Sequence, residues 1–163
     1  MIEFKHDIPT EQTMIFESIF EEELRMELTD KDELLAKCDC TYLYVDGEIA
    51  GEIYTIPIDI LKQEGMGDGD DKKIIEDISP YFGQTAYYYS TSLLPKFRGM
   101  GLSKIFKAYH NGYLKGLGYN KVTGHSTSDG ILRVNEFFGA KNIRTHKNWF
   151  DTNRDATFYE ITL

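Results

Sequence analysis

Cysteine is scarce in this sequence, and the only two, Cys38 and Cys40, form a single C-x-C pair. A structural zinc site takes four ligands, commonly as two spaced pairs, and a disulfide scaffold needs several bridges. No second pair accompanies this one. We therefore interpret both cysteines as free thiols and expect no metal site.

Long apolar runs are missing as well. No segment reaches the ~18 uninterrupted apolar residues that a membrane-spanning helix requires. The N-terminal stretch MIEFKHDIPT also lacks the apolar core of a secretory signal. These absences favour a cytoplasmic protein without a membrane partner.

Basic residues are outnumbered, with 18 Lys and Arg against 27 Asp and Glu and a formal net charge of −9. Proteins that coat nucleic acids show the opposite balance. We therefore expect no nucleic-acid partner, and the excess of carboxylates favours neutral or cationic ligands.

The length of the chain, 163 residues, suits one domain that buries ~68–70% of its unfolded surface. The sequence contains no internal repeat and no linker between two halves. We predict a single domain over residues 1–163.

Apolar periodicity and turn residues predict an alternation of strands and helices. The expected order is a strand at 2–6, a helix at about 10–28, a short helix from 29 or 30, two strands flanking Asp46-Gly47, a short helix near 72–78, a strand at 85–94, a helix at 101–118, a strand at 119–126, a helix at about 129–138 and closing strands at roughly 141–150 and 156–162. The Asp-Gly dipeptide indicates a type I′ hairpin. The strand-helix-strand unit at 85–126 predicts a parallel pair joined by a right-handed crossover.

The long helix at 101–118 is expected to turn one apolar side toward the sheet. That side carries Leu102, Ile105, Phe106, Tyr109, Tyr113, Leu114 and Leu117. 

An acidic glycine segment precedes the short helix, with Asp68, Asp70 and Asp71 among three glycines. Its spacing lacks the alternating Asp or Asn ligands and the final Glu of a calcium-binding loop. We interpret it as a solvated loop.

The pattern R-G-M-G, residues 98–101, lies where a strand gives way to the long helix. Gly99 and Gly101 allow a ligand to approach the backbone, and the N–H groups and dipole of a helix start attract an anion. The spacing matches neither the dinucleotide loop G-x-G-x-x-G nor the nucleoside-triphosphate loop G-x-x-x-x-G-K-[ST]. The pattern indicates a pyrophosphate site or, alternatively, only a tight turn at a helix entry.

This stretch resembles the acetyl-coenzyme A loop of the GNAT N-acetyltransferase superfamily. The family signature is Gln or Arg, two residues, Gly, one residue, then Gly or Ala, and the chain has Arg98, Gly101 and Ser103 in those places. Ser103 departs from the signature but is still small. The usual run-up P-x-F-R-G-x-G is present at residues 95–101.

A second motif, SDGILRVNEFFGAKNI, is similar to the family pattern N-x-x-M-x-x-x-N-x-x-x-G-F. Asn135 and Gly139 match it, while Ser128, Ile131 and Ala140 replace Asn, Met and Phe. The two motifs, together with the order of elements, extend the resemblance over nearly the whole chain.

The resemblance implies an α/β (α+β) fold, with a twisted mixed sheet of about six or seven strands flanked by about four helices and splayed between two central parallel strands. It implies an N-acetyltransferase whose co-substrate is acetyl-CoA. The implied coenzyme-binding residues are Leu93 and Leu94 for the pantetheine arm, Phe97, Arg98, Gly99, Met100, Gly101, Leu102 and Ser103 for the pyrophosphate, and Asn135 near the thioester.

The catalytic residues follow the family pattern less closely. Relatives often protonate the departing sulfur with a Tyr, and here that place is taken by Asn135, which can donate a hydrogen bond but is not a general acid. Relatives often use a Glu on the central strand as base, which this strand lacks. His125 is the candidate base, directly or through water. A hydrogen-bonded strand-end histidine is the alternative.

The acceptor side is indicated by aromatic and acidic residues. Tyr87 and Tyr89 are candidates to line the acceptor channel and Trp149 to wall it, with a core position as the alternative for each. Acidic side chains should attract a cationic amine, namely Glu17, Glu21, Glu22, Glu23, Asp68, Asp70 and Asp71. A GNAT-fold module that binds acyl-CoA or a protein without turnover remains the alternative function, and a homodimer is compatible with the resemblance.

Overall fold

The computed structural model describes residues 1–7, 36–64 and 70–163. The helices expected at about 10–28 and from 29 or 30 lie outside these residues, as do residues 65–69 of the acidic glycine segment.

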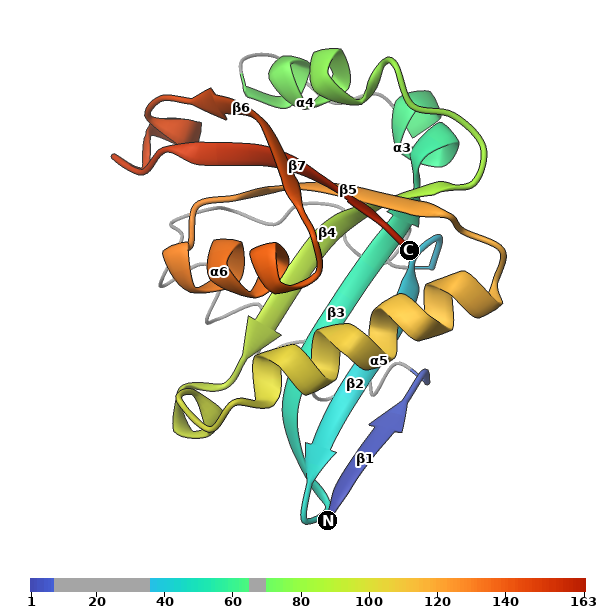
Figure 1. Ribbon diagram of the computed structural model, residues 1–163, viewed down its shortest axis with the longest axis vertical. Coiled ribbons are helices and arrows are strands. Elements are labelled where there is room, and N and C mark those ends of the chain that lie inside the picture. The colour runs from blue at the N-terminus through green and yellow to red at the C-terminus, as the bar shows by residue number, and fades with distance from the viewer. Residues whose placement is uncertain (8–35, 65–69) are drawn as a thin grey trace.

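A seven-stranded mixed sheet forms the centre of the fold (Figure 1). Its order is β1-β2-β3-β4-β5-β7-β6, and β4 and β5 are the one parallel pair among neighbouring described strands. The strands are β1 (Ile2–Lys5), β2 (Asp39–Val45), β3 (Glu48–Pro57), β4 (Thr85–Leu93), β5 (Lys121–Ser126), β6 (Lys141–His146) and β7 (Ala156–Thr162).

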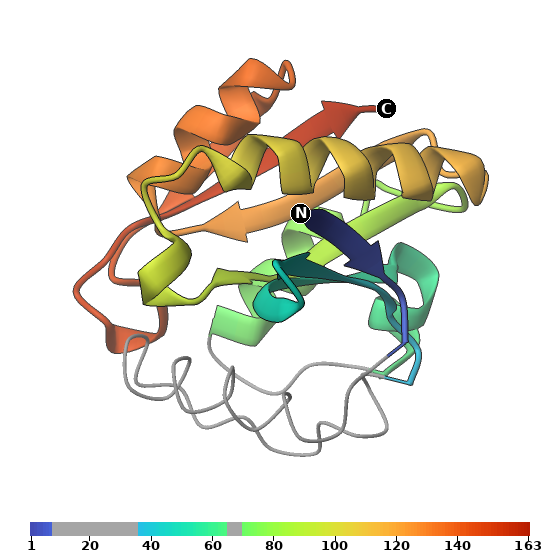
Figure 2. The same cartoon turned by 90° about the horizontal axis from the view of Figure 1, so that it is seen from below.

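Four α-helices in the described part of the chain flank this sheet. They are α3 (Ile58–Glu64), α4 (Asp70–Ile78), α5 (Leu102–Gly116) and α6 (Asp129–Phe137). Helices α5 and α6 cover one face, whereas α3 and α4 lie toward the other (Figures 1 and 2). None of these helices combines the length and the apolar character needed to cross a bilayer.

The core is divided between the two faces of the sheet. Under α5, Phe106 and Leu114 pack on strand residues that include Leu43 and Ile53. On the opposite face, α3 and α4 contribute Leu61, Ile74 and Ile78, which pack with Ile56 and Phe158 of the strands. 

The predicted fold class is confirmed by the seven strands, the flanking helices and the parallel β4–β5 pair. The hairpin turn is also confirmed, because Asp46 has φ 51° and Gly47 has φ 81°, as a type I′ turn requires. Neither Cys38 nor Cys40 forms a disulfide, and burial raises the pKa of Cys40 to about 11.

Helix α3 was not predicted. Pro57 has no backbone N–H to donate and ends β3, and the next residues turn into a helix whose Ile58 and Leu61 are buried.

The penultimate strand is shorter than predicted. β6 ends at His146, and Asn148 and Phe150 both have φ 48°, which breaks the extended chain. Trp149 therefore begins a short 3-10 turn (Trp149–Asp151) instead of lying in a strand, and its ring is buried.

The buried side of α5 is rotated from the predicted one. Its buried residues are Leu102, Phe106, Lys107, His110, Asn111 and Leu114, whereas Ile105, Tyr109 and Leu117 are exposed. The three polar residues are buried because each has a partner inside, such as the Tyr88 hydroxyl, which donates to Asn111 Oδ1 at 2.5 Å.

His110 is fully buried between two hydroxyl groups. Its Nδ1 lies 2.8 Å from Thr41 Oγ1 and its Nε2 lies 3.1 Å from Thr55 Oγ1. Burial, reinforced by the charges of Lys107 and His6, lowers the pKa of His110 to about 3 from 6.5.

We expect His110 to make the fold sensitive to acid. Between pH 6.5 and about pH 3 the His110 imidazole is protonated in the unfolded chain but neutral in the folded protein. The free energy of unfolding should therefore decrease as the pH is lowered. The loss should be about 3 kcal/mol at pH 4. Urea denaturation at pH 7 and pH 4 should show a loss of stability that is smaller by this amount in His110→Gln than in the wild type. Equal losses in the wild type and His110→Gln would contradict the assignment.

Candidate active site

The central parallel strands run together only over their first halves. β4 pairs with β5 from Thr85 to Tyr88, and the last pair joins Tyr88 to Gly124. A bulge then leaves Tyr89 as an extra residue opposite β3, and such bulges bend a strand. Beyond it, β4 continues along β3 while β5 continues along β7, so their C-terminal ends point apart (Figure 1).

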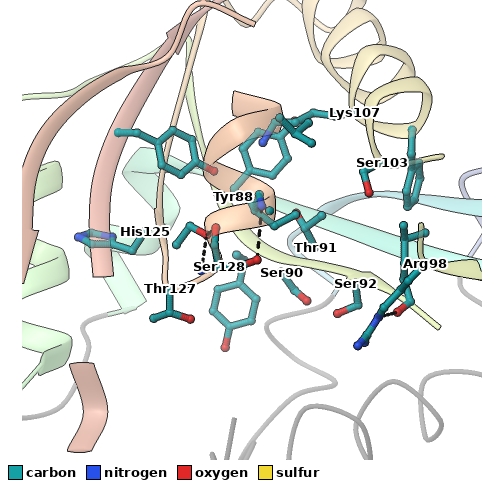
Figure 3. A pocket seen from close by; sticks show the side chains of 18 of the residues that line it. Tyr88, Ser90, Thr91, Ser92, Arg98, Ser103, Lys107, His125, Thr127 and Ser128 are labelled. Atoms are coloured by element: carbon teal, nitrogen blue, oxygen red, sulfur yellow. Dashed lines mark hydrogen bonds between the residues drawn. The ribbon is translucent and has the colours of Figure 1, made fainter. Parts of the chain in front are cut away.

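A cleft of about 750 Å³ opens where these strands part. It is bounded by the second half of β4, the start of α5 and the junction of β5 with α6. Hydroxyl groups line much of it, from Ser90, Thr91, Ser92, Ser126, Thr127 and Ser128. Arg98 and Ser103 lie at one end of the cleft, whereas His125 and Thr127 lie at the other (Figure 3). Its lining combines these hydroxyl groups with apolar side chains, which suits a ligand that has both polar and apolar parts.

The glycine loop contains two residues with left-handed backbone. Gly99 has φ 77° and Gly101 has φ 75°, values that favour glycine. Gly101 is the N-cap residue of α5, and it has no side chain that could cap the first N–H groups of that helix. Uncapped N–H groups and the helix dipole together attract an anion.

The predicted loop residues divide into two groups. Arg98 and Ser103 line the cleft, and Gly99, Met100 and Gly101 are exposed beside it. Phe97 and Leu102 pack into the core under α5 and hold the loop in place.

The two predicted pantetheine contacts on β4 are not equivalent. The N–H of Leu94 donates to Ala50 O at 2.9 Å, so it is engaged by β3. Because successive residues of a strand turn their backbone groups to opposite edges, Leu93 faces the cleft, and its carbonyl accepts from Arg98 Nε at 2.9 Å. The geometry therefore favours Leu93 over Leu94 as a backbone contact.

Asn135 is fully buried behind the cleft wall. Its Oδ1 accepts a hydrogen bond from Lys107 Nζ. Lys107 lines the cleft, and its Nζ lies 4.0 Å from the centre of the Tyr88 ring. The predicted contact of Asn135 with the thioester stays a prediction, because Lys107 is the side chain that faces the cleft.

His125 is held from both sides. Its Nε2 lies 2.9 Å from Asp77 Oδ2 and its Nδ1 lies 2.9 Å from the Tyr87 hydroxyl. An ionised carboxylate only accepts, so Nε2 donates and Nδ1 accepts from Tyr87. Burial lowers the pKa of His125 to about 4, although Asp77 opposes this shift. A role as base stays a prediction, and it requires one of these bonds to open.

Asp77 on α4 is the centre of a buried polar cluster. Its Oδ2 also accepts from His146 Nε2 at 2.5 Å, and its Oδ1 accepts from Arg144 at 2.9 Å. Burial alone would raise the pKa of Asp77, but the hydrogen bonds from His146 and His125 outweigh burial and lower it. The ligand atoms of Asp77, His125 and His146 lie within 4.8 Å of one another, a set that can bind a divalent metal. In this structure the three groups satisfy one another.

The aromatic candidates take different places. Tyr89 lines the cleft, whereas Tyr87 is buried and points to His125. Trp149 stacks on the His125 ring at 4.8 Å between centroids and belongs to the core on that face.

Two residues of the site, Lys107 and Asp77, were missed by sequence reasoning. A signal existed for Lys107, since it lies four residues after Ser103 and therefore on the same side of the helix. No local signal marks Asp77, because its partners lie on β5 and β6.

No protein-family model matches the chain, and no curated protein matches its sequence. Solved structures match it closely in fold. A Drosophila melanogaster polyamine N-acetyltransferase, which forms N-acetylagmatine, gives a TM-score of 0.76 at 13% identity over 100% of each chain. An apo mutant of agmatine N-acetyltransferase gives 0.76 at 16% identity over 100% of each chain. A GNAT family acetyltransferase from Elizabethkingia anophelis with acetyl-CoA bound gives 0.65 at 15% identity, over 99% of this chain and 98% of that one. The chain therefore has the fold of the GNAT N-acetyltransferases.

Proposed function

We propose that the protein is an N-acetyltransferase that moves an acetyl group directly from acetyl-CoA to a primary amine. The observation that carries this proposal is the cleft between the parted strands, which ends at the Arg98–Ser103 loop and the uncapped start of α5. The structural neighbour from Elizabethkingia anophelis has acetyl-CoA bound, which supports the choice of co-substrate.

Coenzyme A would lie along the cleft with its phosphates at the α5 end. The N–H groups around Gly101 and the guanidinium of Arg98 would face the pyrophosphate. The pantetheine arm would follow β4 past Leu93, which places the thioester near the inner end of the cleft, where β4 and β5 part.

The acceptor amine would enter from the end bordered by His125, Thr127 and Arg154. A neutral amine attacks the thioester carbonyl, the carbon–nitrogen bond forms, and the carbon–sulfur bond breaks to release a thiolate. Holding both reactants in one cleft removes much of the entropic cost of their encounter.

The acceptor is proposed to be cationic, such as a polyamine or a basic peptide. The net charge of −9 supports this, because a negative protein attracts cations over its whole surface. Two structural neighbours are named for polyamines and agmatine. The acidic residues Glu17 and Glu21–Glu23, on which the sequence prediction also depended, lie outside the described residues.

The proposal is tested by incubating the protein with acetyl-CoA and a panel of amines, and by measuring thiol release and product mass. We expect turnover with spermidine, agmatine or a basic peptide in preference to neutral and anionic amines. Raising ionic strength from about 0.01 to about 0.15 M shortens the Debye length from ~30 to ~8 Å, so kcat/KM for these cations should fall several-fold. Coenzyme A binding without thiol release for any amine would instead favour the non-catalytic module. Equal rates with all amines at every salt concentration would contradict the cationic acceptor alone.

A further inference from the structure

A buried lysine stands at the inner end of the cleft. Lys107 is 2% exposed, lies on α5 and lines the cleft, yet it belongs to a helix face that is otherwise packed against the sheet. Burying an ammonium group is costly unless a ligand or a partner compensates for the lost hydration. A lysine in this position therefore needs an explanation.

Within the described residues, the surroundings of Lys107 supply dipoles but no negative charge. Its Nζ donates to Asn135 Oδ1 and lies 4.0 Å from the centre of the Tyr88 ring and 5.4 Å from that of Tyr159. Burial is the only cause that shifts its pKa, to about 7 from 10.5, so no carboxylate of residues 1–7, 36–64 or 70–163 offsets the cost. The ammonium group of Lys107 therefore has no counter-ion among these residues, and its position suits an anion that forms inside the cleft.

The position of Lys107 indicates which anion this is. Tyr88, under the ammonium group, is the last residue of β4 that pairs with β5, so Nζ lies where the cleft closes. Ser103, one helical turn earlier on the same side of α5, lines the phosphate end. A coenzyme whose phosphates lie at that end directs its sulfur toward the closed end. 

We propose that Lys107 is the catalytic residue that protonates the coenzyme A thiolate, with Asn135 as the positioning residue that orients its Nζ. This inference rests on the proposed function. When the amine attacks, the carbon–sulfur bond breaks and its electron pair goes to sulfur, which takes a proton from Nζ and leaves Lys107 neutral. The acceptor nitrogen gives up its own extra proton to solvent, and solvent returns a proton to Lys107.

The lowered pKa suits this role. A general acid works best when its pKa lies near the working pH, and such catalysis contributes ~10²–10⁴-fold. The acid must be protonated to act, so the rate should fall as the pH rises through the pKa of Lys107 in the complex.

The test compares Lys107→Met with Lys104→Met. Methionine is unbranched and apolar, so the buried position should accept it, and Lys104 is an exposed lysine on the same helix. The first readout needs no turnover: it is the pKa of the thiol of bound coenzyme A, followed by the ultraviolet absorbance of the thiolate. We expect this thiol pKa to be lower in the wild type and Lys104→Met than in Lys107→Met, because an ammonium group stabilises a nearby thiolate.

The second readout is kcat for acetyl transfer against pH. Lys107→Met should lose ~10²-fold or more and also lose the decline at high pH, with little change in the Kd of coenzyme A. Asn135→Leu should lower kcat by less and keep the decline. If bound coenzyme A has the same thiol pKa in the wild type and Lys107→Met, the role of Lys107 is wrong and the proposed function still stands. If the wild type binds no coenzyme A, both proposals are overturned.

Discussion

Gly101→Asp is expected to weaken coenzyme A binding by up to about 1000-fold while leaving the protein folded. The new carboxylate would lie at the start of α5, where the pyrophosphate is proposed to bind, and two like charges ~4 Å apart repel by about 4 kcal/mol at an effective dielectric constant of ~20. No described atom lies within 4 Å of a Cβ placed at Gly101, so the strain of the new side chain comes only from the backbone φ of 75°. Isothermal calorimetry with coenzyme A measures the effect.

The matched control for this variant is Gly101→Asn, which has the same shape without the charge. Asp and Asn are the side chains that best tolerate a positive φ, here 75°, so both variants should fold, with a similar and small loss of stability relative to the wild type. Thermal unfolding without ligand should confirm this. An Asp variant that is folded and binds coenzyme A as tightly as the Asn variant would place the phosphates elsewhere.

Much of the fold could be predicted because its signals are local. The alternation in β2 and β3 and the Asp46-Gly47 turn define the hairpin within a single stretch of chain. In the β4–α5–β5 unit, Gly99 and Gly101 mark the junction between strand and helix. The parallel pairing of β4 and β5 could therefore be predicted from the order of the elements. Where the signal was weak, as at Pro57 and after His146, the helix and the turn were missed.

The buried polar residues could not be predicted in the same way, because their partners are distant in sequence. A lysine in an amphipathic helix is ordinarily exposed, and Lys107 is buried only because Asn135, on another helix, and the Tyr88 ring, on a strand, meet it. His110 similarly depends on Thr41 and Thr55. Tertiary contacts thus overrode the apolar pattern of α5, which placed Ile105 inward although it is exposed.

The same reasoning applies to the helix between β3 and β4. The position of α4 was predicted, but its attachment to the sheet was not. Asp77 of α4 is hydrogen-bonded to His125 and His146, which lie 48 and 69 residues further along the chain. Through His125 this attachment reaches the wall of the cleft. Asp77 therefore links the stability of α4 to the geometry of the proposed acceptor end.

Asp77→Asn is expected to lower the free energy of unfolding by about 3 kcal/mol or more, because it removes one partner of a buried charged cluster. The carboxylate accepts three hydrogen bonds on two oxygens, whereas the amide has one oxygen and an NH₂ group that must face one of the donors. For a chain of this size, such a loss corresponds to a fall in Tm of roughly 6–12 °C. Thermal unfolding at pH 7 is the measurement.

The control for Asp77→Asn is Glu76→Gln, which removes the same charge from the neighbouring, exposed position of α4. Surface changes of this kind usually alter stability by ~0.5 kcal/mol or less, so this variant should unfold close to the wild type. The difference should also depend on pH. Asp77 has a lowered pKa, so its contribution is present above the carboxyl pKa of 3.8 of the unfolded chain and is lost as the pH falls through the lower value in the folded protein. At neutral pH the two variants should therefore differ most, and equal Tm values there would show that the Asp77 cluster does not hold α4 to the sheet.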